Sequence, residues 1–530
     1  MEATPTDGDI RDAIVVGAGP GGLTAGSLLA AEGLAVLVLD SNERPGGTSR
    51  GFTRSGFTFP AGPLGFTSPR AVKDVLEGRG AIDGLDIRLV DYVVDAFGNR
   101  VKISQEFERL ASELALMFPG EQKGVATFFR DIDAVRRELV ATPPGATPLL
   151  GPLGEESAAN LVSRLVSDEF LRRLLGAIGT GEPRAGFPVL AAMWDIMCER
   201  GIWYPAGGFN SLAEDLARGL EARGGQVRAC CVVSEILVKD GRVYAVSLTD
   251  GTVVQAPVVI SNADFKTTFL VLLSPDAQPP EWLAAVREAP VSTSIFQVAL
   301  GIEEREADLS AFEEASRIVY RRGKPDAVQP SPAWEKAEID PASLAAQELE
   351  VSLWSREDPS LAPAGGAVVV IRTAADHAHF AGYRPAPCRR SPGYAGYKER
   401  LAGAIVEEAS KVLPGLDGAI RVMDVATPLT FEEKGGRFAG CAAGWSQRHG
   451  DVGDYAVRSL VRTPIQGLYM AGYQAFSWLY WGGVSTAVLS GASAARSVLK
   501  GDGPVHAVTL PSPGKRQVPS ESDEPPAEPA

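Results

Sequence analysis

The sequence has little histidine, little cysteine and no excess of positive charge. Only 4 His and 5 Cys occur among 530 residues, and no cysteine pair has C-x-x-C spacing. These counts argue against a metal centre of imidazole and thiolate ligands, so we predict no metal site. We expect the cysteines to be reduced, cytosolic thiols that pack as small apolar side chains. The net charge of −15 argues against a nucleic-acid partner.

Long apolar segments without a turn signal are also missing. Residues 467–495 contain no charged side chain and have the length to cross a bilayer. Their many glycines and serines favour a buried loop and helix, so we predict no transmembrane helix. Residues 501–530 are rich in Pro, Ser and Glu without apolar periodicity, which predicts a disordered tail.

Glycine is the residue that the chain has in excess. It accounts for 58 of 530 residues, above the usual frequency of roughly 7%. No collagen-like repeat accompanies it, so the excess must serve turns and close approaches of the backbone. The length exceeds that of one compact core and predicts more than one domain.

A glycine-rich turn follows the first predicted strand. The apolar run 13–16 leads into G-x-G-x-x-G at Gly17, Gly19 and Gly22, then into a helix of small residues. A second apolar strand comes next, and Asp40 closes it. A lone G-x-G-x-x-G is weak evidence, but here the strand, helix, second strand and acid all have the required spacing. The segment therefore predicts a dinucleotide site.

Each part of this motif has a mechanical reason. Gly17 permits a tight turn, Gly19 lets the backbone approach a pyrophosphate, and Gly22 lets the helix pack on the sheet. The helix N-terminus supplies free N–H groups and partial positive charge to the pyrophosphate. Asp40 is placed to accept hydrogen bonds from a ribose.

Three further segments carry a family resemblance. The R-P-G-G sequence at 44–47 makes the chain resemble FAD enzymes of the glutathione-reductase type rather than nicotinamide dehydrogenases. The stretches W-Y-P-A-G-G at 203–208 and V-V-I-S-N-A-D at 258–264 resemble the phytoene-desaturase branch. Near the C-terminus, a strand ends at Gly472 and G-G-V-S-T at 482–486 opens a helix. In that family this helix faces the pyrimidine edge of the flavin, where its dipole stabilises negative charge.

The resemblance implies FAD as the cofactor and a set of residues that hold it. The candidate cofactor-binding residues are Gly17, Gly19, Pro20, Gly21, Gly22, Asp40, Ser41, Gly46, Gly47, Thr48, Val233, Asn262, Gly472, Gly483 and Val484.

The resemblance also implies the fold class and the division of the chain. We expect an α/β protein with a Rossmann-like, glutathione-reductase-type FAD-binding domain and a second, α+β substrate domain built on an antiparallel sheet plus helices. The discontinuous FAD-binding domain comprises 10–65, 200–275 and 455–500. The substrate-binding domain comprises 66–199 and 276–454.

The function implied is that of an FAD-dependent oxidoreductase acting on C–C bonds of an apolar isoprenoid or polyene such as a carotenoid. The reaction is desaturation, or flavin-dependent isomerisation or saturation. We find no second strand–G-x-G-x-x-G–helix unit for a nicotinamide, so we expect oxygen or a quinone as electron acceptor. Such substrates reside in bilayers, which implies a cytoplasmic protein docked peripherally on the membrane. Segments 115–118 and 125–129 are either an amphipathic docking surface or ordinary core.

Several alternatives stay open at this point. The aromatic-rich segment 473–481 either lines a polyene channel or packs against the flavin. A flavin amine oxidase is the second reading, although G-G-T-S-R stands where that class has G-G-R, and a non-catalytic flavin-binding scaffold is the third. Glu182 with Arg184, and His377 with His379, are better explained as surface pairs or solvated loops. No catalytic acid or base is assigned, and the oligomeric state is left open.

Overall fold

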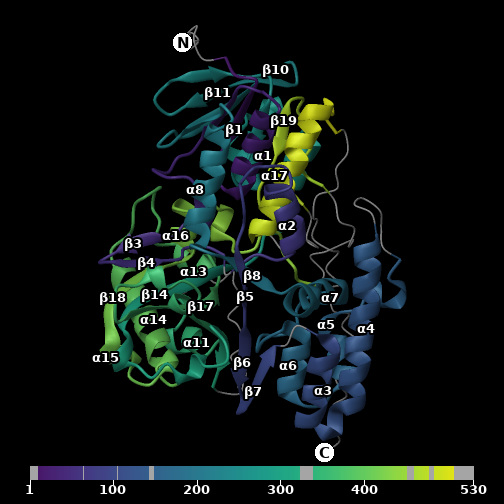
Figure 1. Ribbon diagram of the computed structural model, residues 1–530, viewed down its shortest axis with the longest axis vertical. Coiled ribbons are helices and arrows are strands. Elements are labelled where there is room, and N and C mark those ends of the chain that lie inside the picture. Colours follow the sequence, from purple (N-terminus) through teal and green to yellow (C-terminus); the bar gives the residue numbers. More distant parts are fainter. Residues whose placement is uncertain are drawn as a thin grey trace, which may run out of the picture.

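The computed structural model describes residues 10–63, 65–103, 106–142, 149–322, 338–449, 459–476 and 483–505. Figure 1 shows three regions: a parallel sheet with its helices at the top, a large mixed sheet at the lower left, and a helical group at the lower right. Segments from far apart in the sequence build the two sheet regions, whereas consecutive helices build the third.

The upper region is built on a five-stranded parallel sheet of order β19-β13-β1-β2-β9. Its strands are β19 (Leu468–Met470), β13 (Val259–Ser261), β1 (Ala13–Val16), β2 (Val36–Leu39) and β9 (Gln226–Arg228). Every residue of β1 and β2 is buried, as is typical of the strands of a parallel sheet that is covered on both faces. Helices α1 (Pro20–Ala31), α8 (Gly208–Glu221) and α17 (Gly483–Lys500) pack on this sheet, with α1 in contact with both other helices. The Rossmann-like prediction is confirmed.

A small antiparallel sheet adjoins the parallel one. It consists of β10 (Val233–Lys239), β11 (Arg242–Leu248) and β12 (Val253–Gln255). The β10–β11 turn uses Asp240 and Gly241, both with positive φ, at 51° and 73°. Aspartate and glycine tolerate this conformation best, so the D-G pair at this turn predicts the hairpin directly.

The lower left region is a seven-stranded sheet of order β18-β14-β17-β16-β15-β6-β7. Its strands are β18 (Ile420–Ala426), β14 (Ser294–Glu303), β17 (Gly366–Ala375), β16 (Leu349–Leu353), β15 (Arg317–Arg321), β6 (Tyr92–Ala96) and β7 (Asn99–Ile103). All neighbours are antiparallel except β15 and β6, which a long stretch of chain separates. Helices α11 (Pro341–Ala345) and α14 (Tyr394–Ala409) lie beside this sheet (Figure 1). The predicted second region of antiparallel sheet plus helices is confirmed.

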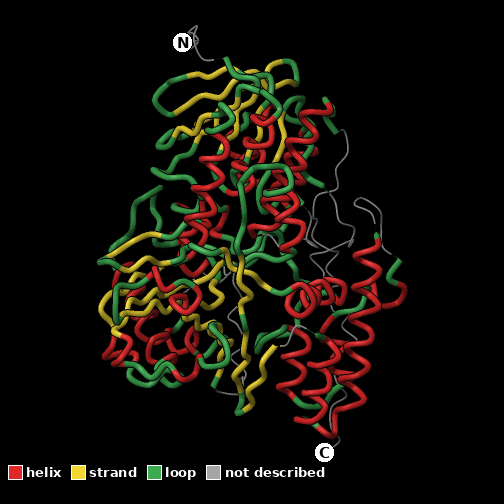
Figure 2. The backbone as a smooth tube through the Cα atoms, in the orientation of Figure 1, coloured by secondary structure: helices red, strands yellow, loops and turns green. Residues whose placement is uncertain are grey.

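The lower right region is helical, as the red coils of Figure 2 show. It contains α3 (Phe107–Met117), α4 (Gln122–Ala141), α5 (Ala158–Leu165), α6 (Glu169–Ala177) and α7 (Phe187–Trp194). Phe128 and Phe129 both meet Trp194 edge to face, with ring centroids 6.1 and 5.3 Å apart. Segment 125–129 therefore serves the core and not a docking surface, whereas Leu116 in the other candidate segment is 79% exposed.

Short elements connect these regions. Two ribbons pair β3 (Phe52–Arg54) with β4 (Phe57–Phe59) and β5 (Ile87–Val90) with β8 (Ile202–Pro205). Further helices are α2 (Pro69–Leu76), α9 (Phe265–Thr267), α10 (Pro280–Glu288), α12 (Trp354–Glu357), α13 (Ala378–Ala381), α15 (Leu416–Ala419) and α16 (Pro428–Glu433). Across the ranges given above, we find no helix with both the length and the hydropathy needed to cross a membrane.

Candidate functional site

The turn between β1 and α1 is shaped by glycine for two different reasons. Gly17 has a φ of +99°, a conformation that other residues rarely adopt. At Gly22 the constraint is space, because a Cβ there would lie 2.1 Å from the carbonyl oxygen of Gly17. Gly19 caps the N-terminus of α1, and no side chain caps this end or places an acid in its first turn. The N–H groups of that turn are left for an anion.

Asn262, directly after β13, lies against the same turn. Its backbone N–H donates to the carbonyl of Val16 at 2.8 Å. A Cβ at Gly19 would lie 2.7 Å from Asn262 Nδ2, and one at Gly21 would lie 2.6 Å from Asn262 Oδ1. Oδ1 is buried and accepts no hydrogen bond from the described residues. The asparagine of the 258–264 stretch therefore explains why Gly19 and Gly21 lack side chains.

Asp40 follows directly on the last residue of β2 and lies at the edge of the turn. Its Oδ2 accepts a hydrogen bond of 2.6 Å from the N–H of Ala18, which ties the acid to the glycine turn. Its Oδ1 accepts from the backbone N–H and the side-chain amide of Asn42, at 2.8 and 2.9 Å. The carboxylate is 4% exposed and still lines the cavity described below. Its orientation is thus set before a ribose is bound.

The N-terminus of α17 also lines this site. Gly472 follows β19 with a φ of +103°, and its N–H donates to Ser490 Oγ at 3.0 Å. Ser485 in the first turn of α17 accepts from the N–H of Thr67 and donates to its carbonyl, at 2.9 and 2.7 Å. These bonds hold the start of α17 against the segment that follows the β3–β4 ribbon.

A single cavity of about 1760 Å³ runs from the glycine turn to the seven-stranded sheet. All but three of the predicted cofactor-binding residues line it. The predicted residues that line the cavity are Gly17, Gly19, Pro20, Asp40, Ser41, Gly47, Thr48, Val233, Asn262, Gly472, Gly483 and Val484. Residues from five separate stretches of the chain thus converge on one space, as the sequence predicts.

The other three, Gly21, Gly22 and Gly46, have packing roles outside the cavity lining. A Cβ at Gly21 would lie 2.8 Å from the carbonyl oxygen of Ala487 in α17. Gly46 has a φ of +123°, and a Cβ there would lie 3.1 Å from Cβ of Ala213 in α8. Direct contact of these three with a cofactor stays a prediction.

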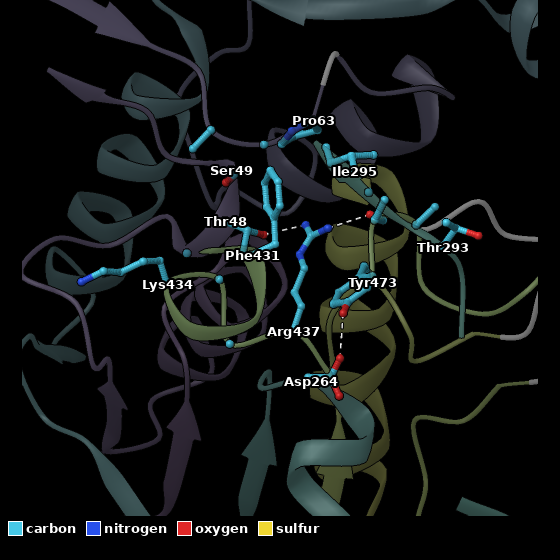
Figure 3. A pocket seen from close by; sticks show the side chains of 18 of the residues that line it. Thr48, Ser49, Pro63, Asp264, Thr293, Ile295, Phe431, Lys434, Arg437 and Tyr473 are labelled. Atoms are coloured by element: carbon cyan, nitrogen blue, oxygen red, sulfur yellow. Dashed lines mark hydrogen bonds between the residues drawn. The ribbon is translucent and has the colours of Figure 1, made fainter. Parts of the chain in front are cut away.

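A polar group that the sequence does not single out as a site lies beside Thr48, as Figure 3 shows. Arg437 donates from Nη2 to Thr48 Oγ1 at 2.8 Å and from Nη1 to the carbonyl of Ala442 at 2.6 Å. Its guanidinium lies over the ring of Tyr473, 4.8 Å from the centroid. The Tyr473 hydroxyl donates to Asp264 Oδ2 at 2.8 Å. Arg437, Tyr473 and Asp264 all line the cavity.

Burial perturbs the acids of this group. Desolvation raises the pKa of Asp264 above its usual range, although the hydrogen bond from Tyr473 acts in the opposite direction. Burial also raises the pKa of Cys441, whose Sγ lies 3.3 Å from the Tyr473 hydroxyl, to about 11. The arrangement can hold a proton between Asp264 and Tyr473 and keep a fixed positive charge at Arg437 beside the Thr48 loop.

Glu182 and Arg184, which the sequence explains better as a surface pair, both line the cavity. Glu182 pairs with Arg173 at 2.7 Å and not with Arg184. His377 pairs with Glu432 at 2.9 Å. Among the described residues, no group of three or more His, Cys, Asp or Glu could hold a metal ion. Of the aromatic segment 473–481, residues 477–481 lie outside the described residues.

Two cysteines contradict the expectation of buried thiols. Cys198 and Cys441 are buried, but Cys230 and Cys388 are exposed. Both exposed residues occupy positions with positive φ, at 56° and 57°.

The site fits a dinucleotide that carries a flavin. The uncapped N–H groups of α1 suit a pyrophosphate, Asp40 suits a ribose, and the N-terminus of α17 offers partial positive charge at the far end. The positive φ at Gly17 and the close contacts at Gly19 and Gly22 leave the backbone of this turn bare. Side chains would block an approaching phosphate at these places.

Comparisons with known proteins agree with this geometry. A family model described as flavin containing amine oxidoreductase matches residues 20–378. Prolycopene isomerase 1 of an Oncidium hybrid cultivar is 26% identical over 501 residues, which cover 88% of this chain and 80% of that protein. Phytoene desaturase (lycopene-forming) of Pseudescherichia vulneris is 25% identical over 453 residues, covering 80% of this chain and 87% of that protein.

A solved structure shares the fold at lower identity. A mutant of putrescine oxidase superposes with a TM-score of 0.62 at 17% identity, over 93% of this chain and 99% of that chain. The match to the family model covers more than half of the sequence. With a dinucleotide fingerprint and a flavin family, the cofactor is FAD. The chain belongs to the flavin containing amine oxidoreductase family and is an FAD-dependent oxidoreductase.

Proposed function

We propose that the protein transfers hydride between FAD and a C–C bond of an apolar isoprenoid or polyene such as a carotenoid. The outcome is a desaturation, or a flavin-dependent isomerisation or saturation. The observation that carries the proposal is the continuous cavity of about 1760 Å³, which leads from the glycine turn past Thr48 to the seven-stranded sheet. FAD occupies the part of this cavity beside the glycine turn, and the part that continues to the seven-stranded sheet is left for the substrate. The similarity to a prolycopene isomerase and a phytoene desaturase supports the same substrate class.

The cofactor contacts and the domain limits belong to this proposal. FAD lies along the cavity with its pyrophosphate at Gly17 and Gly19, its adenosine ribose at Asp40 and its flavin near Thr48 and Gly483. Segments 10–65, 200–275 and 455–500 form the FAD-binding domain, and 66–199 with 276–454 form the substrate-binding domain. The five-stranded and seven-stranded sheets, which draw on these separate sets of segments, support the division.

The route of the substrate and of the electrons completes the proposal. The protein is cytoplasmic and docks peripherally on a membrane, where polyenes dissolve, and it passes electrons to oxygen or a quinone. Leu116 and Met117 at the end of α3 support a docking surface, because their side chains are 79% and 43% exposed. The buried segment 125–129 takes no part in it.

Amine oxidation is the second candidate. The family description and the fold shared with putrescine oxidase favour it. Carboxylates that line the cavity, among them Glu348 and Glu350, are chemically suited to attract a cationic amine.

Flavin reduction under anaerobic conditions separates these candidates. The purified protein should show a flavin spectrum that bleaches on addition of polyene-containing liposomes and not on addition of amines. An isomerase would instead form product without net flavin reduction. Bleaching by amines alone would overturn the proposal, and an absence of both bleaching and product would favour a non-catalytic scaffold.

The variant Gly19→Val provides the control for cofactor placement. Its side chain would collide with Asn262 and block the approach of the pyrophosphate. We expect it to lack FAD and to show no bleaching with any substrate. Full FAD occupancy in this variant would refute the placement of the pyrophosphate.

A further inference from the structure

Polar side chains form a continuous row on one face of the seven-stranded sheet. Cross-strand neighbours in a sheet project from the same face. By register, Tyr92 lies opposite Arg317 and Arg317 opposite Ser352, while Glu350 lies opposite Arg372 and Arg372 opposite Gln297. Glu350 and Ser352 are two residues apart in one strand, so both sets share a face. The polar row is the set Tyr92, Gln297, Arg317, Glu350, Ser352 and Arg372.

The opposite face of the same strands is apolar. Val298, Ile318, Val351 and Ile371 alternate with members of the polar row and are fully buried in one hydrophobic cluster. The polar row points the other way, where Glu350 and Arg372 line the large cavity. A purely hydrocarbon substrate would need no such lining, because apolar walls suffice to bind it.

Arg372 is held in place by neutral partners. Its Nε donates to Gln297 Oε1 at 2.8 Å, and its Nη2 donates to the carbonyl of Gly62 at 2.7 Å. Its Nη1 has no hydrogen-bond partner among the described residues, and no described carboxylate lies within 4 Å of the guanidinium. The group is oriented in the cavity wall without an ion pair.

Arg317 adds a second charge to the row. Its side chain has no exposed surface, and its guanidinium stacks on Trp354 at 4.2 Å from the ring centroid. Nη1 donates to the carbonyl of Ser316 at 3.1 Å, but Nε and Nη2 find no partner in the described part of the chain. Buried donors without partners are costly and point to a missing acceptor.

Glu350 is the carboxylate within the row. It accepts a hydrogen bond from Ser352 Oγ at 3.0 Å. Burial raises its pKa, against the influence of Arg372 and Arg317, so the protein stabilises its neutral form more than water does. Glu357 and Asp358 act on the same group of side chains from the Arg317 end, so Arg372 is the cation of the row that lines the cavity without an ion pair.

From this geometry we infer that the polar row binds a carboxylate at one end of an otherwise apolar isoprenoid substrate, with Arg372 as the contact residue. The inference rests on the proposed function and narrows its substrate class to an oxygenated isoprenoid. A carboxylate suits the site because a guanidinium donates two parallel hydrogen bonds to it. A hydrocarbon end would offer no acceptor to Nη1 of Arg372, which has none among the described residues.

Two probes with the same polyene skeleton test the inference. Retinoic acid and methyl retinoate differ in a negative charge and in one methyl group. Each is titrated into the FAD-loaded protein, and the dissociation constant is taken from the perturbation of the flavin spectrum and from equilibrium dialysis. We expect the acid to bind about tenfold tighter than the ester, and Arg372→Gln to remove this preference while FAD occupancy stays complete.

A second variant changes the preference in the opposite direction. Glu350→Gln removes the competing negative charge and keeps the shape, so the affinity for the acid should rise about threefold to tenfold while that for the ester stays constant. Lys434→Gln is the matched control, because it removes a cation that lines the cavity away from the row. It should leave the ratio of the two dissociation constants unchanged.

The outcomes distinguish this inference from the function on which it rests. Equal affinities for acid and ester, or a preference for the acid that Arg372→Gln leaves intact, would overturn the carboxylate site while polyene chemistry stands. A second pair of results would also overturn the carboxylate site: Arg372→Gln loses FAD, while Glu350→Gln keeps the wild-type ratio of the two dissociation constants. These results would assign Arg372 to the cofactor. Failure of both probes to bind, with no bleaching by polyenes, would contradict the proposed function itself.

Discussion

The two large sheets differ in how they meet the cavity. The five-stranded parallel sheet is covered on both faces, and it reaches the cavity only at the strand ends, where bare backbone turns face the ligand. The seven-stranded sheet is apolar on one face and presents side chains from several strands to the cavity on the other. The first sheet therefore presents mainly backbone to the cavity, and the second presents mainly side chains.

This difference explains how tolerant each end of the cavity is to change. A backbone site requires the absence of side chains, so almost any substitution at its glycines fails. A side-chain site can exchange one polar group for another without moving a strand. We therefore expect the FAD end to tolerate few substitutions, and we expect the side chains at the sheet end to determine the substrate specificity.

The largest effect should come from Gly22→Val in the backbone site. Its Cβ would lie 2.1 Å from the carbonyl oxygen of Gly17, so the helix must move away from the strand. We expect a loss of about 3 kcal/mol or more in the free energy of unfolding, and no bound FAD. Denaturant unfolding and the flavin spectrum check this.

The control for this variant is Gly403→Ala, at a helical glycine in the other region. No atom lies within 4 Å of a Cβ at this position. Alanine should stabilise the helix by about 0.5–1 kcal/mol and leave FAD binding unchanged. If Gly22→Val folded normally and bound FAD fully, the glycine turn would tolerate side chains, which would contradict the close packing that we describe.

Next in size is Ile371→Ala, on the apolar face of the seven-stranded sheet. The side chain is fully buried, and its removal leaves a cavity in the core. We expect a loss of about 2–4 kcal/mol in stability with a normal FAD content, measured by thermal unfolding and flavin absorbance. Ser352→Ala on the opposite face removes one hydrogen bond and should cost only about 1 kcal/mol. Equal losses of stability in Ile371→Ala and Ser352→Ala would contradict the division of this sheet into an apolar core face and a polar cavity face.

A smaller effect, dependent on pH, is expected from Tyr473→Phe between the two ends. Burial raises the pKa of Asp264 in the folded protein, so stability falls as the pH rises from the usual aspartate range toward that raised value. Loss of the Tyr473 hydroxyl removes a donor that lowers this pKa. We expect the fall to extend to higher pH and to cost about 1–2 kcal/mol at neutral pH.

Unfolding free energies measured between pH 4 and 9 test this, with Asp264→Asn as the companion variant. That substitution removes the titrating group, so the same stretch of the pH profile should flatten. A wild-type profile that rises with pH across the whole range, unaltered in Tyr473→Phe, would show that Asp264 does not titrate as we expect.

The smallest effect should come from Glu433→Gln, near the mouth of the cavity. Arg390 donates two hydrogen bonds to the Glu433 carboxylate, at 2.9 and 2.7 Å, and lowers its pKa. The pair stabilises the fold above the usual pKa of a glutamate, and this contribution is lost as the pH falls through the lowered value. Because solvent screens the pair, we expect a cost of about 0.5–1 kcal/mol at pH 7. The two proteins should converge in stability near pH 3, and a constant difference would contradict the assignment.

The sequence predicted the fold and the cofactor of the FAD end, and most of the residues that it proposed for cofactor binding line one cavity. Gly17, Gly19 and Asp40 are close together in the chain, and each is required by a local turn whose geometry recurs wherever a dinucleotide binds. Asn262 and Gly472 come from distant segments, but each follows directly on a parallel strand. Parallel strands end at one edge of a sheet, so their order along the chain is enough to bring these residues together.

The substrate end was not predictable in the same way. Arg372, Arg317 and Glu350 belong to three strands whose pairing is set by long-range contacts. A charged residue that alternates with buried apolar ones, as in Glu350-Val351-Ser352-Leu353, reads as an ordinary strand with a solvated face. The Arg437–Tyr473–Asp264 group is likewise assembled from separate segments. From sequence, Tyr473 was noted for its aromatic ring and Asp264 as the end of the 258–264 stretch, but Arg437 was not noted.

By itself the sequence determined the cofactor, the fold class and the turn that binds the dinucleotide, because those depend on local backbone geometry. Only the tertiary structure decided which side chains face the cavity. Strand pairing over hundreds of residues turned the polar face of the seven-stranded sheet inward, toward the cavity, and the apolar face toward the core. That choice places the guanidinium group of Arg372 in the wall of the cavity.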